Sequence, residues 1–239
     1  MKWITLLALL SLLPSCAPMN GYATFVLGPS SSVTRSQSMN IANAYTQMRW
    51  TPSAKNISHS LDRDNILVHT PDHQLSNHGY ANGWWWADRE NASMPYQWGG
   101  FDTPESFLRK IGSGHAAGDI ATAEKRTAGD AAVSKQAAGI DCSGFVSRCW
   151  RLSRPFSTAQ LPAISTPIRW AELKPGDIFL NDKHVLLFAQ WAVPGSAVLC
   201  YETGPFPQWK VSAARIPTEL LFAQGYEPRR YTSITEDPS

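Results

Sequence analysis

Cys142 is the residue whose position most strongly suggests chemistry, because it stands where a helix is expected to begin. Asp141 precedes it, and apolar side chains follow at helical spacing: Phe145, Val146, Cys149, Trp150 and Leu152. The unpaired N–H groups and the dipole at a helix N-terminus favour negative charge, so a thiol there ionises more readily. The thiolate is the attacking form of cysteine. The sequence therefore predicts a nucleophile at Cys142, with a structural cysteine as the alternative.

A general base for that thiol is available in His184, 42 residues further along the chain. It follows a polar turn and precedes a long apolar run typical of a central strand, so its imidazole is expected at a strand edge facing a cleft. A third group should accept the other ring N–H. Glu202 is favoured because it falls on the next predicted strand, and Tyr201 and Gln190 are weaker choices. A surface histidine and a strand-end charge are the alternative interpretations of His184 and Glu202.

The strands that must position these residues lie in the C-terminal part. Residues 185–191 and 198–203 are apolar runs, and Pro194-Gly195 between them is turn chemistry, which predicts an antiparallel hairpin. A shorter strand, 178–180, follows the turn 173–177. A helix followed by an antiparallel sheet predicts an α+β fold.

The N-terminal part offers weaker signals. Spacings of three and four predict a helix over 40–50, capped by Asn40 and ended by Pro52. One strand is expected at 66–69. Thr103-Pro104-Glu105 opens a short helix. Residues 112–139 are Ala/Gly-rich and polar, which predicts a surface insertion with one weak helix.

Four segments carry a resemblance to a known family. In chain order they are Tyr96-Gln97-Trp98-Gly99-Gly100, Gly139 to Val146, Leu173 to Ile178, and His184-Val185. Together, over about residues 93 to 204, they resemble the NlpC family of papain-like bacterial cell-wall endopeptidases. The resemblance implies a papain-like fold in which the cysteine at a helix N-terminus packs on an antiparallel sheet.

The resemblance also implies roles and a reaction. It places the catalytic pair on Cys142 and His184, with Glu202 in the third position, and substrate binding on Tyr96, Asp141 and Ser143. Trp98 is assigned to the same site because its ring could stack on a sugar, with packing as the alternative. The implied reaction is hydrolysis of an amide bond in the stem peptide of peptidoglycan, often after γ-D-glutamate, with no metal or cofactor.

Two features depart from the family's pattern. About 40 residues separate Gly100 from Asp141, where the family usually has far fewer, so an insertion at about 101–139 could reshape or cover the cleft. The third catalytic position is commonly His, Asn or Gln, whereas Glu202 is the candidate here.

The first residues predict export. Lys2 supplies a positive start, Ile4 to Leu13 is apolar but too short to span a bilayer, and Pro14 to Ala17 is a small-residue exit. Leu13 to Cys16 resembles a lipobox, which would make Cys16 a lipid-modified N-terminus and tether a periplasmic protein to a membrane. An ordinary cleavage site at Ser15 to Ala17, releasing the protein, is the alternative.

The predicted domain organisation has three parts. Residues 1–16 are the signal, 17–83 are an N-terminal extension with one helix, of which 18–38 is a tether or loosely packed entry, and 84–239 are the catalytic domain. With Cys16 lipidated, three cysteines remain, so at least one thiol is free. Cys149 and Cys200 form either a disulfide or two buried thiols.

Charge and spacing argue against other classes of function. The net charge of +2, with scattered Lys and Arg, does not indicate a nucleic-acid partner. His69, His73 and His78 lack a zinc-type spacing, and Pro71 argues against a helical pair, so we expect no metal site. Two rivals stay open: the same fold acting on another amide, ester or thioester, and a module that binds wall fragments without turnover.

Overall fold

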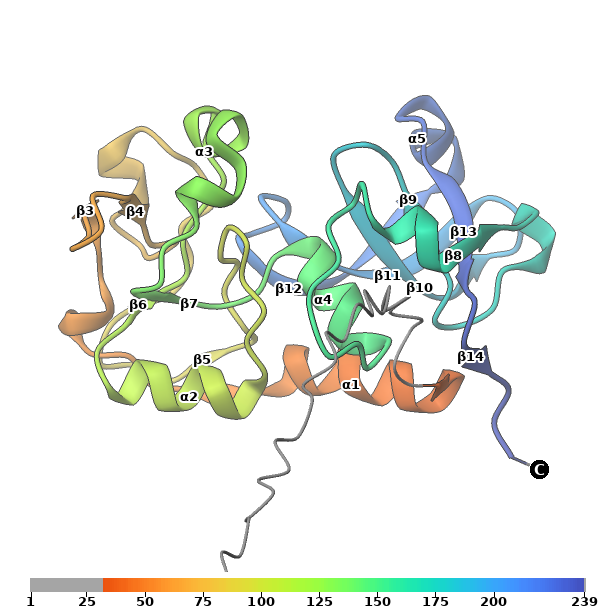
Figure 1. The fold of residues 1–239 in the computed structure, drawn as a ribbon, viewed down its shortest axis with the longest axis horizontal. Coiled ribbons are helices and arrows are strands. Elements are labelled where there is room, and N and C mark those ends of the chain that lie inside the picture. Colours follow the sequence, from red (N-terminus) through yellow and green to blue (C-terminus); the bar gives the residue numbers. More distant parts are fainter. Residues whose placement is uncertain (1–31, 239) are drawn as a thin grey trace, which may run out of the picture.

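Six strands in the C-terminal half form one antiparallel sheet in the computed structural model of the chain, which describes residues 32–238 (Figure 1). Their order across the sheet is β12, β11, β10, β9, β13, β8, and every neighbouring pair is antiparallel. These strands are β8 (Ser165–Pro167), β9 (Ile178–Leu180), β10 (Val185–Val193), β11 (Ala197–Gly204), β12 (Lys210–Pro217) and β13 (Glu227–Tyr231).

Helices pack against this sheet and around the first half of the chain. The α-helices in the described residues are α1 (Arg35–Gln47), α2 (Pro104–Gly112), α3 (Ala123–Ala128), α4 (Cys142–Cys149) and α5 (Thr218–Ala223). Short 3-10 helices are η1 (Ala54–Asn56), η2 (Leu75–His78), η3 (Gly129–Ala132), η4 (Leu161–Ile164) and η5 (Trp170–Glu172). The combination is an α+β fold, as the sequence predicts.

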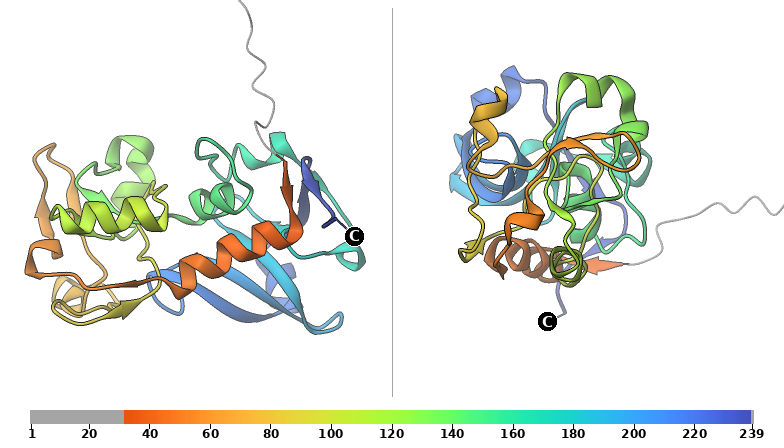
Figure 2. Two further views of the ribbon diagram at one scale, coloured as in Figure 1. Left: turned by 90° about the horizontal axis from the view of Figure 1, so that it is seen from below. Right: turned by 90° about the vertical axis from the view of Figure 1, so that its left-hand side faces the viewer.

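The main core lies between α1, α4 and one face of the sheet. α4 contacts α1, β10 and β11, and α1 also contacts β12. Figure 2 shows α1, in orange, running the length of this layer. Phe145 and Val146 of α4 and Val185 and Leu187 of β10 are buried in one cluster. This packing joins the helix that begins at Cys142 to the strand that follows His184.

Short two-stranded sheets complete the described chain. β2 (Arg49–Trp50) pairs with β5 (Asn91–Ala92), β3 (His59–Leu61) with β4 (Leu67–His69), and β6 (Ala116–Ala117) with β7 (Ala137–Ala138). β1 (Val33–Thr34) runs parallel to β14 (Ile234–Thr235), so the two ends of the described chain lie together. The sheets β2-β5, β3-β4 and β6-β7 lie beside α2 and α3, away from the six-stranded sheet (Figure 1).

The first helix differs from the sequence prediction at both ends. We expected it over 40–50 with Asn40 as its cap, but it begins at Arg35 and ends at Gln47. Thr34 and Gln37 form a capping box, so the helix is capped six residues earlier than expected. The expected tether over 18–38 is also wrong for its described part, because Ser38 is buried within α1.

The segment 112–139 is not the surface insertion that its composition predicts. Ala117, Ile120, Ala137 and Ala138 are completely buried, and β6 and β7 pair in parallel within it. Small alanine side chains allow these two strands to pack closely in the interior. The one expected helix is present as α3.

The predicted strands and the second helix are confirmed. β4, β9, β10 and β11 match the expected runs to within two residues at each end, and β10 and β11 form the hairpin. α2 begins after Thr103, whose hydroxyl accepts the N–H of Ser106. Asp177, in the turn before β9, is buried and accepts hydrogen bonds from Arg35 and Arg230, which tie this turn to α1 and β13.

Candidate active site

Cys142 is the first residue of α4, and the residues around it determine where that helix begins. Asp141 is the N-cap: its backbone is extended, and its carboxylate accepts the N–H of Gly144. The hydroxyl of Ser143 donates to the same carboxylate oxygen at 3.1 Å. An N-cap carboxylate satisfies a backbone N–H that has no partner within the helix. The thiol therefore lies at the positive end of the helix dipole, where the sequence predicts it.

Two glycines allow the loop that follows Tyr96 to lie directly on the start of α4. A Cβ on Gly144 would lie 2.3 Å from the carbonyl oxygen of Gly100. The same carbonyl accepts the N–H of Asp141 at 3.1 Å. Only a residue without a side chain fits so close a backbone approach. Gly100, which ends the first family-like segment, and Gly144, which lies within the second, thus have a steric reason to be there.

A turn closed by Asn181 sets the position of His184. The side-chain oxygen of Asn181 accepts the backbone N–H groups of Lys183 at 3.0 Å and His184 at 2.8 Å. The backbone N–H of Asn181 donates to the carbonyl of His184 at 3.1 Å. Asn side chains commonly close turns in this way. The next four residues, 185–188, are buried in β10, so the imidazole is attached to a rigid strand.

Glu202 faces that imidazole from the neighbouring strand. The register Leu187↔Tyr201 puts Glu202 diagonally opposite His184, on the same face of the hairpin. The Oε2 atom of Glu202 lies 3.2 Å from Nε2 of His184. Because a carboxylate can only accept, Nε2 carries the hydrogen, and Nδ1 is the nitrogen left for the thiol.

The charges around His184 favour its protonated form. Burial lowers its pKa, but the negative charge of Cys142 and hydrogen bonds with Cys142 and Glu202 outweigh burial and raise the pKa to about 10. Burial raises the pKa of Asp141 to about 6, although the N–H of Gly144 and the hydroxyl of Ser143 oppose this. At neutral pH the imidazole of His184 is therefore protonated, and the carboxyl group of Asp141 at the helix cap is mostly ionised.

All seven residues predicted for catalysis and substrate binding line one cavity of about 1040 Å³. Ligand cavities in proteins commonly measure about 300–1,000 Å³, so this one can admit a peptide. Tyr96 is buried in its wall, with its ring 5.2 Å from that of Trp209, and burial raises the pKa of its hydroxyl well above the usual range. Trp98 donates its indole N–H to Gly129 and lies under the guanidinium of Arg126.

Several cavity residues were not predicted from the sequence. Arg126, Asp130 and Val133 come from the 101–139 segment, so this segment does shape the cleft. Phe206 and Trp209 come from the loop between β11 and β12. The concentration of Pro and aromatic residues over 205–209 was a visible signal for this second group. No motif marks the first group, because its place depends on how the segment folds back over Trp98.

The remaining cysteines take no part in this site. Cys149 and Cys200 are free and buried, so the interpretation as two buried thiols is confirmed and a disulfide between them is wrong. Cys16, the predicted lipidation site, lies outside the described residues, as does the whole predicted signal. Among residues 32–238, no helix has the length and apolar character needed to cross a bilayer.

Three histidines meet at a second place in the described chain. His59, His69 and His78 form the one group of three or more potential metal-binding side chains found within residues 32–238, and none of them lines the cavity of Cys142. His73, which the sequence analysis considered with His69 and His78, instead stacks on Trp86. His59, ten residues before His69 in the chain, is outside the set of histidines that the sequence suggests.

Comparison with known proteins adds no relative to this description. No protein-family model, no curated protein and no solved structure matches the chain.

Proposed function

We propose that the protein is a cysteine hydrolase with a papain-like catalytic arrangement that cleaves an amide bond. The observation that carries the proposal is that Cys142, His184 and Glu202 line one cavity, with Nε2 of His184 and Oε2 of Glu202 3.2 Å apart. A thiol, a base and a third group that orients the base are the parts that covalent thiol catalysis needs. The packing of α4 on the sheet that carries β10 and β11 supports the papain-like interpretation.

The reaction follows from the two nitrogens of His184. Nδ1 takes the proton of Cys142, and the sulfur pair forms a bond to the carbonyl carbon while the π pair moves to oxygen. When the C–N bond breaks, the imidazolium gives its proton to the leaving amine and an acyl-thioester remains. Water then gives a proton to Nδ1 and attacks the carbonyl, the C–S bond breaks, and the acid leaves as the thiol regains its proton. Glu202 keeps the ring oriented throughout.

The start of α4 supplies stabilisation of the oxyanion. The N–H of Cys142 is at the first helical position, where no acceptor exists within the helix. In the proposed reaction it donates to the developing negative charge on the carbonyl oxygen and forms one arm of an oxyanion hole. The cap at Asp141 holds this N–H in place because it ties the first turn together.

The substrate that we propose is the stem peptide of peptidoglycan. The four family-like segments support this class, and the cavity volume of about 1040 Å³ accommodates a peptide. Arg126, in the cavity wall beside Trp98, offers a cation for the free carboxylates that stem peptides carry. We also propose export to the periplasm, with a lipid on Cys16 as the membrane anchor and an ordinary signal cleavage as the alternative.

A second candidate is hydrolysis of an amide, ester or thioester that does not come from the cell wall. The observation in its favour is the number of apolar side chains in the cavity lining, which include Phe206, Ile216, Leu220, Leu221 and Tyr226. Such a surface suits an acyl chain better than a charged peptide.

Thiol reactivity tests the catalytic proposal. Iodoacetamide should alkylate Cys142 in the native protein faster than the same cysteine in urea, as located by peptide mass spectrometry, because a helix N-terminus and a neighbouring imidazole favour the thiolate. Cys149 and Cys200 are buried and serve as internal controls that stay unlabelled until the protein unfolds. His184→Ala should bring the native rate down to that of the denatured protein. A native rate no faster than the denatured rate in the wild type would overturn the proposal.

Product analysis tests the substrate. Wild-type protein incubated with purified peptidoglycan should release muropeptides with a newly cut stem, whereas Cys142→Ala should release none and still bind the polymer. Fast alkylation without muropeptide release would favour the second candidate, which acyl esters and thioesters of increasing chain length would then test. Binding without fast alkylation would indicate a module that holds wall fragments without turnover.

A further inference from the structure

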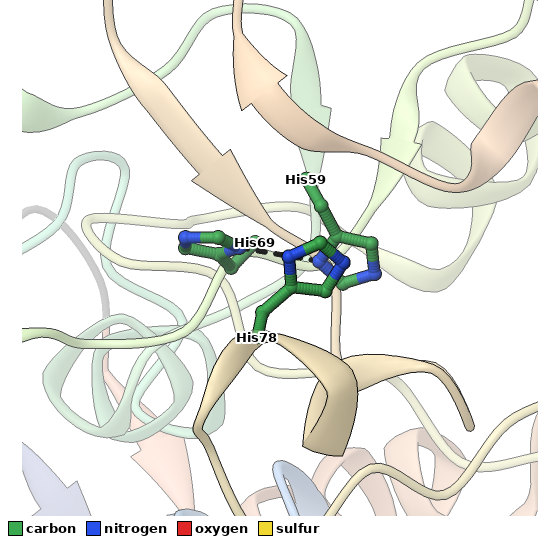
Figure 3. Close-up of side chains that lie close together, drawn as sticks. All are labelled: His59, His69 and His78. Atoms are coloured by element: carbon green, nitrogen blue, oxygen red, sulfur yellow. Dashed lines mark hydrogen bonds between the residues drawn. The ribbon is translucent and has the colours of Figure 1, made fainter.

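His59, His69 and His78 come together from three elements at the far end of the molecule from the six-stranded sheet (Figures 1 and 3). His59 begins β3 and His69 ends β4, and the two residues are directly opposite each other in the register of this hairpin. His78 ends η2, which returns the chain beneath them. The potential ligand nitrogens of the three rings all lie within 4.8 Å of one another.

The closest pair of nitrogens already has the separation of two ligands of one metal ion. Nδ1 of His59 and Nδ1 of His69 are 3.2 Å apart. Two nitrogens bound tetrahedrally to zinc at about 2.05 Å lie about 3.3 Å from each other. The ligand nitrogen of His78 lies up to 4.8 Å from the other two, so its ring must move closer to share an ion with them. The side chain of His78 is exposed and can make this movement. Its ring already stacks on that of His59, with the centroids 4.0 Å apart.

A buried carboxylate sets the tautomer of His59. Oδ2 of Asp72 lies 2.9 Å from Nε2 of His59, and Asp72 is completely buried. The hydroxyl of Thr70 and the backbone N–H of Gln74 also donate hydrogen bonds to this carboxylate, so both of its oxygens have partners within the protein. The carboxylate can only accept, so Nε2 carries the hydrogen and the lone pair of Nδ1 points towards His69. A carboxylate behind a histidine is the usual outer arrangement of a metal-bound imidazole.

The second ring is held inside the protein. His69 is buried at the end of β4, so its Nδ1 atom is kept opposite that of His59. A hydrogen bond between His69 and His59 would also satisfy these two rings, but it leaves no role for the convergence of His78.

We propose that His59, His69 and His78 bind one divalent transition-metal ion of the Zn²⁺ type, with Asp72 as the positioning residue and the fourth position open to water. Three imidazoles and no carboxylate among the ligands suit such an ion and not Mg²⁺ or Ca²⁺, which prefer oxygen. The ion would join β3, β4 and η2. Leu75 of η2 packs in one cluster with Tyr96 and Trp209, so the bound ion would also brace one wall of the Cys142 cavity.

The test uses Cys142→Ala as the reference protein, since a thiol beside an imidazole could itself bind zinc. The full chain without added histidines is stripped with a chelator and titrated with ZnCl₂ in a calorimeter. We expect one site per chain and no heat with MgCl₂. His78→Gln removes an exposed ligand without disturbing the core, and should weaken Zn²⁺ at least about tenfold. Asp72→Asn should weaken it by about 10–100-fold.

His73→Gln is the matched control: its ring stacks on Trp86, and its Nδ1 lies 3.9 Å from Oδ1 of Asp72, the oxygen that does not contact His59. It should bind Zn²⁺ like the reference protein. Co²⁺ gives a second readout: the reference should show the visible absorption of nitrogen-bound Co²⁺, and His78→Gln should lose most of it. The proposal is overturned if the reference binds no Zn²⁺, or if His59→Gln and His78→Gln bind as tightly as the reference. The first outcome leaves a hydrogen-bonded histidine pair, and the second leaves adventitious surface binding. Because the catalytic thiol is absent throughout, these results are independent of the proposed hydrolase activity.

Discussion

Replacing Gly144 with alanine should damage both the fold and the chemistry, because the added methyl group meets backbone. Its Cβ would lie 2.3 Å from the carbonyl oxygen of Gly100, whereas ordinary contacts begin at 3.4 Å, so the two segments must separate by about 1.1 Å. Unlike a side chain, this carbonyl cannot rotate away, since it also accepts the N–H of Asp141. The strain therefore falls on the helix start that carries Cys142.

The magnitude follows from two opposed contributions. Alanine stabilises a helix by about 1 kcal/mol relative to glycine, and overpacking of an interior costs about 1–3 kcal/mol. The contact is far below the normal limit, so we expect the upper part of that cost and a net loss of about 1–2 kcal/mol in the free energy of unfolding. A displacement of about 1 Å at the nucleophile can reduce catalysis by about 100-fold. Alkylation of Cys142 and any hydrolysis should slow accordingly.

Gly112→Ala is the matched control. It makes the same chemical change in the last turn of α2, where an added Cβ meets no atom within 4 Å. Urea unfolding should show this variant as stable as the wild type or up to about 1 kcal/mol more stable, with an unchanged alkylation rate. If Gly144→Ala matches Gly112→Ala in both measurements, the close approach of Gly100 to α4 is not what positions the thiol.

Two further predictions concern ion pairs. Glu202→Gln removes a charge that raises the pKa of His184, so the alkaline limb of the pH profile for alkylation or hydrolysis should move down by about 1–3 pH units. The exposed Glu219→Gln should leave that limb in place, and an unmoved limb in Glu202→Gln would count against the role given to Glu202. In the wild type the buried ammonium of Lys125 lies 2.6 Å from the carboxylate of Asp119. Asp119→Asn leaves that ammonium without a counter-charge and should lower the free energy of unfolding, measured in urea, by about 3–5 kcal/mol. Arg169→Ala, in an exposed pair, should leave the urea midpoint unchanged; a wild-type midpoint for Asp119→Asn would contradict the prediction.

Elements that depend on neighbouring residues were predictable. The hairpin of β10 and β11 follows from two apolar runs around Pro194-Gly195, and α2 from the Thr103 cap. Both α4 and the position of Cys142 in it follow from Asp141 and the apolar spacing after it. The first helix begins earlier than the apolar spacing predicts because Thr34 and Gln37 form a capping box, which is also a local signal.

In the candidate site, too, local sequence indicated the residues, whereas their arrangement in space depends on the tertiary structure. Cys142, His184 and Glu202 could be named because each sits at the end of, or within, an element whose type its neighbours determine. The resemblance of four segments to a known family predicted that these residues lie close together. For His184 and Glu202, the register of β10 with β11 gives this prediction a geometric basis. The roles of the three residues stay predictions until the thiol is tested.

By itself the sequence determined where α2, α4 and the hairpin of β10 and β11 form and where the thiol, imidazole and carboxylate fall, because propensity, capping and turn chemistry act within a few residues. Only the tertiary structure decided that Gly100 rests on Gly144, that Arg126 reaches the cavity, and that His59 meets His69 and His78. These contacts join segments between 9 and 44 positions apart, or depend on how a whole segment folds back. A local pattern does not encode such pairings, because they depend on which buried faces the rest of the chain leaves to be filled.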